Sequence, residues 1–125
     1  LSSPVLSFTC MEAPAEGIAE RRRMQSGPNY RTDLAMVVVD PDEQFAAFCG
    51  MWYVPQCKYG YVEPVATDPS YRRMGLGRAA VVAGIRACAG EGAAAVYVGS
   101  DQEFYKGLGF SVCHVANCFL KRFER

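Results

Sequence analysis

The chain has 125 residues, half of them hydrophobic, and its 13 basic residues balance 13 acidic ones. This length suits one domain over residues 1–125, and the composition argues against intrinsic disorder. A neutral balance lacks the excess positive charge typical of proteins that bind nucleic acids or anionic membranes. No apolar run approaches the roughly 20 residues that span a bilayer. We therefore expect a globular protein with neither a nucleic-acid nor a membrane partner.

Six cysteines stand at positions 10, 49, 57, 88, 113 and 118. None of them forms a Cys-x-x-Cys pair, which argues against a zinc site. Four lie in apolar stretches, so we expect reduced cysteines that act as small core residues. With no visible signal peptide, this favours a cytoplasmic location. The first residue is Leu1 rather than Met, and we expect a trimmed chain or part of a longer protein.

In chain order, the first half of the sequence predicts one helix and four strands. Residues 5–10 suit a short strand, and residues 12–25 suit a helix. The apolar, β-branched runs at 34–40 and 45–54 predict an antiparallel hairpin. A third run, at 58–67, is again dense in Tyr and Val and predicts another strand.

The second half of the sequence changes pattern. Residues 68–77 read as a loop that leads directly into a helix at 78–89, which is apolar on most sides and is therefore expected to be buried. A strand at 93–98 and a short helix at 101–108 follow, and the residues up to 123 are strand-like. A hairpin followed by strand, loop, helix and strand predicts an α+β (mixed α/β) fold with one βαβ crossover.

The loop before the second helix has the properties of a phosphate-binding site. A glycine-rich turn that opens a helix exposes backbone N–H groups at the positive end of the helix dipole. Gly75 and Gly77 lack side chains, so a pyrophosphate can approach the backbone. Arg72, Arg73 and Arg78 add positive charge, and arginine pairs well with phosphate. The same spacing also suits a plain tight turn.

Two motifs give this loop a family resemblance. Arg72-x-x-Gly75-x-Gly77 resembles the pyrophosphate-binding signature of the GNAT acetyltransferase family, and Pro69-Ser70-Tyr71-Arg72 resembles its usual lead-in. The segment at 104–110 resembles the second signature, Tyr-x-x-x-Gly-Phe. The resemblance implies a mostly antiparallel mixed sheet with a splayed parallel strand pair and flanking helices. It also implies an acetyl-CoA-dependent N-acetyltransferase acting on a small-molecule or peptide amine.

By this resemblance acetyl-CoA, a co-substrate that needs no metal, lies in a gap between the strands at 58–67 and 93–98. Pro64 supports such a gap independently, because proline in a central strand is acceptable only at a bulge or where pairing has opened. The expected cofactor-binding residues follow the strand end and the loop: Val65, Ala66, Thr67, Arg72, Arg73, Met74, Gly75, Leu76, Gly77 and Arg78.

The resemblance also implies two catalytic side chains. Glu63 is the only carboxylate within its strand and takes the position of the general base, where burial beside apolar neighbours is expected to raise its pKa. The alternative is a strand-edge glutamate that pairs with an arginine or faces water. Tyr105 takes the position of the acid that protonates the leaving thiolate. The alternative for Tyr105 is an aromatic ring that packs beside the sulfur.

Two other functions are compatible with the sequence. Gly75-x-Gly77-x-x-Ala80 also fits a loose dinucleotide-binding fingerprint, although the residues between the strand and Gly75 disfavour it. The family usually has two helices between its first two strands, and this chain has room for one. A segment before Leu1 or a second protomer of a homodimer would then complete the acceptor site. Alternatively, the domain is a non-catalytic acyl-CoA sensor or half of a tandem protein.

Overall fold

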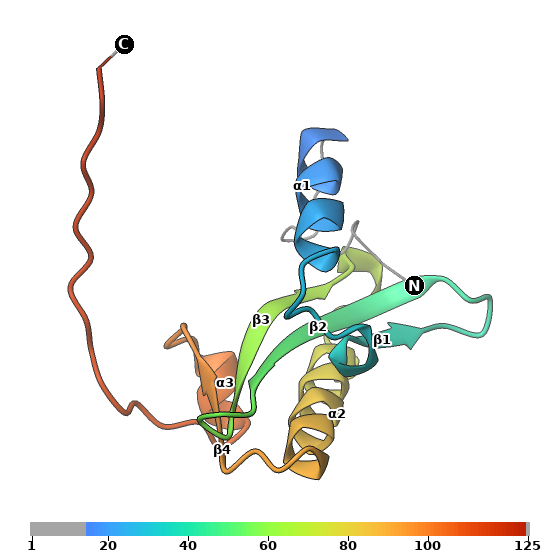
Figure 1. The fold of residues 1–125 in the computed structure, drawn as a ribbon. Coiled ribbons are helices and arrows are strands. Elements are labelled where there is room, and N and C mark those ends of the chain that lie inside the picture. The colour runs from blue at the N-terminus through green and yellow to red at the C-terminus, as the bar shows by residue number, and fades with distance from the viewer. Residues whose placement is uncertain (1–14, 125) are drawn as a thin grey trace.

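A computed structural model describes residues 15–124 of the protein and is shown as a ribbon in Figure 1. Its elements, in chain order, are α1 (Ala15–Gln25), the 3₁₀ turn η2 (Thr32–Leu34), β1 (Met36–Val39), β2 (Phe45–Val54), β3 (Tyr59–Thr67), the 3₁₀ turn η3 (Pro69–Tyr71), α2 (Leu76–Gly90), β4 (Ala95–Val98) and α3 (Glu103–Gly107). The predicted elements between residues 15 and 108 all have counterparts. The strand predicted for 5–10 and the start of the helix predicted for 12–25 lie outside the described residues.

The four strands form one sheet in the order β1-β2-β3-β4. β1 pairs antiparallel with β2, β2 antiparallel with β3, and β3 parallel with β4. Helix α2 makes the crossover that a parallel pair requires. The structure therefore confirms the predicted mixed fold with a mostly antiparallel sheet.

A β-bulge interrupts β3 at its centre. The register between β2 and β3 shifts so that Glu63 and Pro64 stand opposite the single residue Gly50. A Cβ atom at Gly50 would lie only 2.5 Å from the carbonyl oxygen of Glu63, so this close approach of backbones requires glycine. Proline was expected here only at a bulge or where pairing has opened, and Pro64 lies at a bulge, which tolerates a residue without an N–H.

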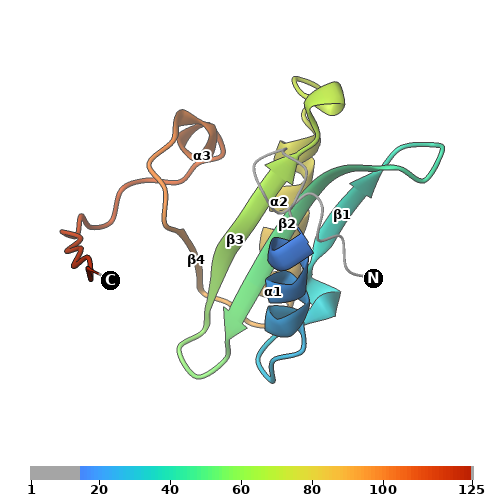
Figure 2. The ribbon, with the colours of Figure 1, turned by 90° about the horizontal axis from the view of Figure 1, so that it is seen from above.

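The helices cover opposite faces of the sheet: α1 lies on one face and α2 on the other (Figure 2). The main core lies under α2, where Cys49, Met51, Val62 and Val81 are at most 3% exposed. Gly84 of α2 packs directly on Met51, with its hypothetical Cβ 2.7 Å from Met51 Cγ. None of the helices in the described part of the chain combines the length and apolar character needed to cross a bilayer.

Helix α2 corrects one prediction. It was expected to be buried on most sides, but Ala79, Ala83 and Arg86 are exposed while Val81 and Cys88 are buried. The outer face of α2 is covered by small alanine side chains rather than by another layer of protein. Alanine favours the helix through its backbone propensity and does not require burial.

Two further predictions, on the cysteines and on the C-terminal residues, are also corrected by the structure. Cys49 and Cys88 are buried core residues, and burial raises the pKa of Cys49 to about 12. The other described cysteines (Cys57, Cys113 and Cys118) are exposed, so most of them are not core residues. Residues 111–124, expected to be strand-like up to 123, form no strand and are exposed throughout. A strand forms only beside a pairing partner, and this segment has none within the described chain.

Candidate active site

The sheet opens along the second half of β3. β4 pairs with β3 only from Tyr59 to Val62, where Val62 lies opposite Val98. From residue 63 to 67, β3 keeps β2 as its neighbour, and no described strand pairs with its other edge. The gap expected between the two parallel strands therefore begins directly after Val62. We call residues 63–67 the open half of β3 and residues 59–62 the paired half.

One hydrogen bond shows in which direction the backbone N–H and C=O groups of the open half point. The N–H of Asp68 donates to the carbonyl of Ala46 at 2.9 Å, which directs residue 68 toward β2. Because backbone groups of successive residues point alternately to the two sides of a strand, Ala66 also faces β2. Val65 and Thr67 direct their N–H and C=O groups toward the gap. Of the three strand residues expected to contact a cofactor, two thus direct backbone groups into the gap.

The loop after β3 is held at both ends of η3. Asp68 caps this turn, since its carboxylate accepts the N–H of Ser70 at 2.9 Å. The Tyr71 hydroxyl donates to the carboxylate of Asp40, at the end of β1. This bond lowers the pKa of Asp40, helped by the N–H of Gln44, and raises the pKa of Tyr71. The tyrosine of the family lead-in therefore ties the loop to the far edge of the sheet.

The two motif glycines at the start of α2 have different roles. Gly75 precedes the helix with φ of 75°, the left-handed conformation that glycine favours, and its hypothetical Cβ meets nothing within 4 Å. Gly77 is buried, and a Cβ there would lie 2.8 Å from Thr67 Oγ1 and 3.8 Å from Phe104. Gly75 therefore faces open space where a ligand can approach. Gly77, also expected to bind the cofactor, lets α2 pack closely on β3 and α3 because it has no Cβ.

The start of α2 has the properties of an anion site. Gly75 has no side chain to cap the helix, and the first-turn N–H groups have no partners within an α-helix. Arg72, Arg73 and Arg78 are all exposed beside this turn. Arg78 also makes a long hydrogen bond of 3.4 Å to the carbonyl of Gly107, which links α2 to α3. Positive charge thus surrounds an accessible helix N-terminus.

Tyr105 lies on the α2 side of the sheet. Its half-buried ring packs against the core that contains Cys49, and makes edge contacts with Phe104 and Phe110 at centroid distances of 5.0 and 5.8 Å. Burial, with a smaller contribution from Cys49, raises the pKa of Tyr105 above its ordinary value. The phenol therefore stays protonated near neutral pH and can donate a proton.

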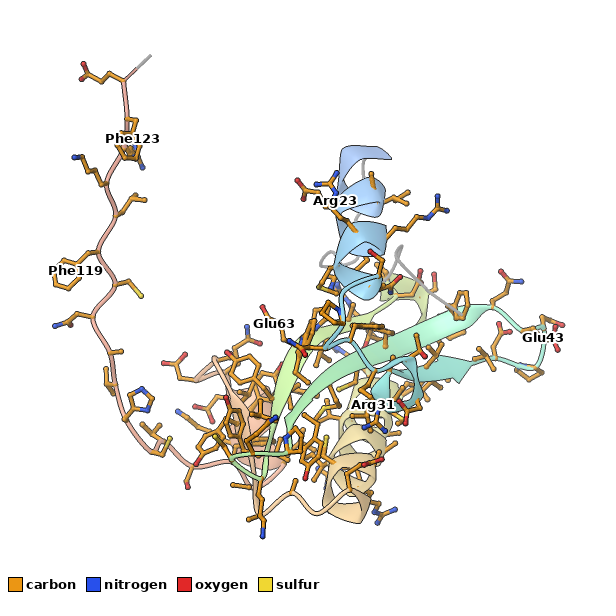
Figure 3. The ribbon with its side chains drawn as sticks, viewed as in Figure 1. Arg23, Arg31, Glu43, Glu63, Phe119 and Phe123 are labelled. Carbon is orange, nitrogen blue, oxygen red and sulfur yellow. The ribbon has the colours of Figure 1, made fainter. Side chains whose placement is uncertain are left out.

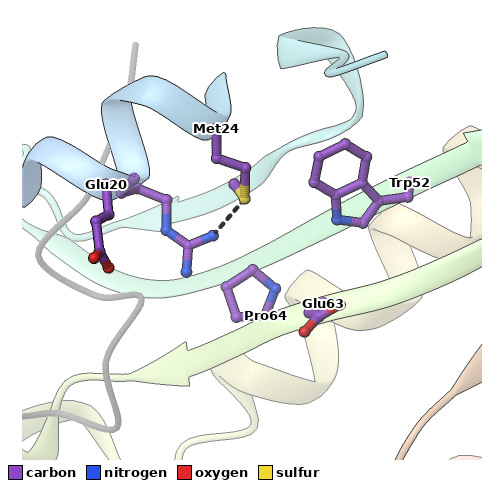
Figure 4. Close-up of a pocket in the computed structure, with 6 residues that line it drawn as sticks. Glu20, Met24, Trp52, Glu63 and Pro64 are labelled. Atoms are coloured by element: carbon purple, nitrogen blue, oxygen red, sulfur yellow. Dashed lines mark hydrogen bonds between the residues drawn. The ribbon is translucent and has the colours of Figure 1, made fainter. Parts of the chain in front are cut away.

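Glu63 lies on the opposite side, facing α1, and not in the core. It was expected to be buried, but its side chain is exposed (Figure 3). Strand alternation explains this difference, because the preceding residue Val62 points into the core under α2 and successive side chains point to opposite faces. Glu63 lines a pocket of about 380 Å³ together with Pro64, Trp52 and, from α1, Glu20, Arg21 and Met24 (Figure 4).

The pocket adds residues that the motifs did not identify. Glu20 and Met24 are four positions apart and therefore share one face of α1, a spacing that was visible in the sequence. Trp52 of β2 also lines the pocket. No cluster of three metal-ligating side chains is found between residues 15 and 124. The site thus has carboxylates on one face of β3, and a phenol and an anion site on the other.

Comparisons with known proteins agree with this geometry. The model of the Acetyltransferase (GNAT) family matches residues 7–110. A search of curated proteins found no match. Among solved structures, an acetyltransferase from Trypanosoma brucei is 24% identical, with a TM-score of 0.68, and the alignment covers 89% of this chain and 83% of that one.

Two further structures are similar at lower identity. The aminoglycoside N-acetyltransferase AAC(6')-Iy, in complex with a bisubstrate analogue of CoA, is 17% identical with a TM-score of 0.67, and the alignment covers 88% and 82% of the two chains. The glucosamine-6-phosphate N-acetyltransferase from Arabidopsis thaliana is 21% identical with a TM-score of 0.60, covering 87% and 78%. These likenesses support the fold, and the family model spans both sequence signatures. The chain therefore belongs to the GNAT family of acetyltransferases.

Proposed function

We propose that the protein is an acetyl-CoA-dependent N-acetyltransferase that acetylates a primary amine by direct attack on the thioester. The observation that carries this proposal is the open half of β3, which separates two complementary sites. On the α2 side lie the anion site before α2 and the protonated phenol of Tyr105. On the α1 side lies a pocket with two carboxylates. A cofactor and an amine would meet in the gap from opposite faces.

The α2 side fits acetyl-CoA. The pyrophosphate would accept hydrogen bonds from the first-turn N–H groups of α2, with Arg72, Arg73 and Arg78 around it. Exposed Met74 and half-buried Leu76 flank this position. The pantetheine amides would pair with the backbone of Val65 and Thr67, much as an added strand pairs with an open edge. The open space beside Gly75 supports this fit.

The α1 side fits a cationic amine. Glu20 and Glu63 outnumber the single cation Arg21 among the lining residues, and Trp52 supplies an aromatic ring that can contact an ammonium group. Two of the similar solved structures are named as acetyltransferases of aminoglycosides and of glucosamine 6-phosphate, which are amines. We infer a small-molecule or peptide amine as the acceptor.

The reaction follows from these positions. An ammonium group in the pocket loses a proton to the Glu63 carboxylate, directly or through one water. The amine nitrogen then forms a bond to the thioester carbonyl carbon, while the developing oxyanion accepts the Val65 N–H. The nitrogen of the tetrahedral adduct gives its second proton to solvent, the C–S bond breaks as the adduct collapses, and Tyr105 donates its phenolic proton to the leaving sulfur. The products are an amide and the CoA thiol, and solvent restores both side chains.

Glu63→Gln tests the assignment of the base, and Glu20→Gln is its matched control in the same pocket. With a panel of polyamines, aminoglycosides, amino sugars and lysine peptides, the release of CoA thiol and the mass of the product identify the acceptor. We expect Glu63→Gln to lower kcat by about 10²–10⁴-fold near neutral pH, and less at high pH, where more amine is already deprotonated. Glu20→Gln removes a binding charge and is expected to act mainly on KM.

The outcomes separate the proposal from its alternatives. Equal effects of the two variants on kcat would contradict the role of Glu63 as base. CoA binding by calorimetry without turnover of any amine would favour a non-catalytic acyl-CoA sensor or a partner domain. Thermal protection by NADH rather than by CoA would contradict the cofactor assignment itself.

A further inference from the structure

The pocket on the α1 side contains a positive charge that a simple amine does not use. Its lining includes Glu20 and Glu63 but also Arg21, so charges of both signs line one space of about 380 Å³. This volume is at the lower end of the roughly 300–1,000 Å³ typical of small-molecule sites. A ligand with a second ammonium group would meet the charge of Arg21, and like charges brought together in a binding site lower affinity. The lining therefore suits a compact molecule with one cationic and one anionic group.

Arg21 makes a weak contact in this pocket that an anion can replace. Its side chain is half-buried, whereas its neighbours Arg22 and Arg23 are exposed. One N–H of its guanidinium donates to the sulfur of Met24 at 3.4 Å, the dashed line in Figure 4. A thioether is a weak acceptor, and a carboxylate in its place would form a shorter, charge-assisted hydrogen bond. Only this N–H has to change its partner, so any other contact of Arg21 can persist.

The charges of the pocket favour a carboxylate over a phosphate as the anionic group. Its charged lining residues are two glutamates and one arginine. A phosphate group carries about −1.5 to −2 near pH 7 and would be repelled by both glutamates. A carboxylate carries a single charge, which one guanidinium can pair with in a planar arrangement. The rest of the lining is apolar and suits an apolar substituent on the ligand: Met24, Trp52 and Pro64.

We propose that the acceptor is a free amino acid with an apolar side chain, which places its carboxylate on Arg21 and its ammonium group beside Glu63. This inference rests on the proposed function, because it takes the pocket as the acceptor site. The transfer itself is unchanged. The amine nitrogen gives one proton to Glu63 and a second to solvent, and it replaces the CoA sulfur on the acetyl carbon. The sulfur takes the proton of Tyr105, and the products are an N-acetyl amino acid and the CoA thiol.

Trp52 allows binding to be measured independently of acetyl transfer. It is the only tryptophan in the sequence and lines the pocket, so its fluorescence reports a ligand there. L-leucine, L-leucinamide and 3-methylbutylamine share the amine and the apolar chain, and only leucine has the carboxylate. In titrations of the full chain with CoA present, we expect leucine to bind at least about tenfold more tightly than the other two. Glucosamine 6-phosphate, an amine that carries a phosphate, should also bind more weakly than leucine. Equal or tighter binding of any of these three compounds would overturn the proposal.

Arg21→Gln tests the residue assigned to the carboxylate, and Arg22→Gln on the same helix is its matched control. By release of CoA thiol, we expect Arg21→Gln to raise KM for leucine by about tenfold or more and to leave KM for 3-methylbutylamine unchanged. A purely structural role of Arg21 would change both values together, and that result would contradict the assignment. Arg22→Gln should change neither value.

The two measurements separate this inference from the proposed function. Binding of leucine without any acetylation would support the ligand class and contradict the proposed N-acetyltransferase activity. Acetylation of another amine, with no binding of leucine, would support the activity and contradict the amino-acid acceptor.

Discussion

The two halves of β3 belong to one strand and yet have different neighbours and different roles. In the paired half, β2 and β4 flank the strand, and Gly60 lies under Cys88 and Val96, with its hypothetical Cβ 3.0–3.3 Å from their atoms. In the open half, one edge faces the gap. The paired half leaves no room for a ligand, whereas the open half has backbone groups directed into the gap. A single bulge at Glu63 and Pro64 separates them.

This difference shows how one sheet serves both stability and function. Parallel pairing of β3 and β4 fixes the base of the gap, and the divergence beyond Val62 provides the space. The open half is not loose, because β2 still pairs with it and the bond from Asp68 to Ala46 holds its end. A ligand that adds to this edge would thus meet a strand already in position, which lowers the entropic cost of binding.

The largest effect is expected from the hydroxyl of Tyr105, which packs against the core on the α2 side of the sheet. Tyr105→Phe removes the proton donor and leaves a ring that can pack as before, so we expect turnover to fall by about 10²–10⁴-fold. Stability against urea should change little. Tyr97→Phe on β4, which lies opposite Tyr61 in the paired half, is the control and should keep full turnover. A Tyr105→Phe enzyme with wild-type kcat would show that water protonates the sulfur.

The next largest effect is expected from Gly50→Ala, a substitution at the bulge. The Cβ of Gly50→Ala would lie 2.5 Å from the Glu63 carbonyl oxygen and 2.9 Å from Pro64 Cδ, and backbone atoms cannot move aside as a flexible side chain can. We expect the free energy of unfolding to fall by about 1–3 kcal/mol in urea titrations. Gly90→Ala, where nothing lies within 4 Å of the added Cβ, is the matched control. Equal stabilities of the two variants would show that the bulge adapts freely.

The two motif glycines give a third contrast, between binding and packing. Gly75→Val places a branched side chain in the open space before α2, and we expect CoA affinity by calorimetry to fall by more than about fivefold, or about 1 kcal/mol. The same variant forces valine to a φ of 75°, which also lowers stability. Gly77→Ala should act chiefly on stability, through Thr67. CoA affinity within about twofold of wild type for Gly75→Val would refute the phosphate site.

Much of this site could be predicted from the sequence because its motifs record backbone requirements. Gly75 marks a left-handed residue before a helix, and Pro64 marks a bulge beside an opening. Both features are local, since each depends on the conformation that one residue type allows. The order of strands also followed from local patterns, because a hairpin and one crossover leave few possible topologies.

The rest depended on contacts between distant segments. The pocket beside Glu63 depends on where α1 packs, and no pattern within β3 records that position. Gly77 stands in the same motif as Gly75, and only the approach of Thr67 shows that its missing Cβ also allows close packing. Residues 111–123 have the composition of a strand, yet a strand also needs a partner, which local sequence cannot supply.

The smallest effect concerns the bond that ties the end of the open half to the rest of the sheet. Tyr71→Phe removes the hydroxyl that donates to Asp40. Both residues are only partly buried, so we expect only a small decrease in melting temperature near neutral pH. Ser70→Ala, in the same turn, is the control, because Ser70 contributes its backbone N–H rather than its side chain.

The pH dependence of that decrease distinguishes this bond from a general packing effect. The bond lowers the pKa of Asp40, so its stabilisation is complete above the ordinary carboxyl pKa of about 3.9 and is lost as the pH falls through the lower pKa of the folded state. The bond also raises the pKa of Tyr71, so its stabilisation is complete below about pH 10 and is lost as the pH rises through the higher folded value. The difference in melting temperature between wild type and Tyr71→Phe should therefore be constant from about pH 5 to 9 and shrink below about pH 4, where Asp40 becomes protonated. A difference that stays the same down to pH 2 would mean that the ring environment, and not the carboxylate, anchors the loop. In that case the loop after β3 would be positioned only by the pairing of β3 with β2 and by the bond from Asp68 to Ala46.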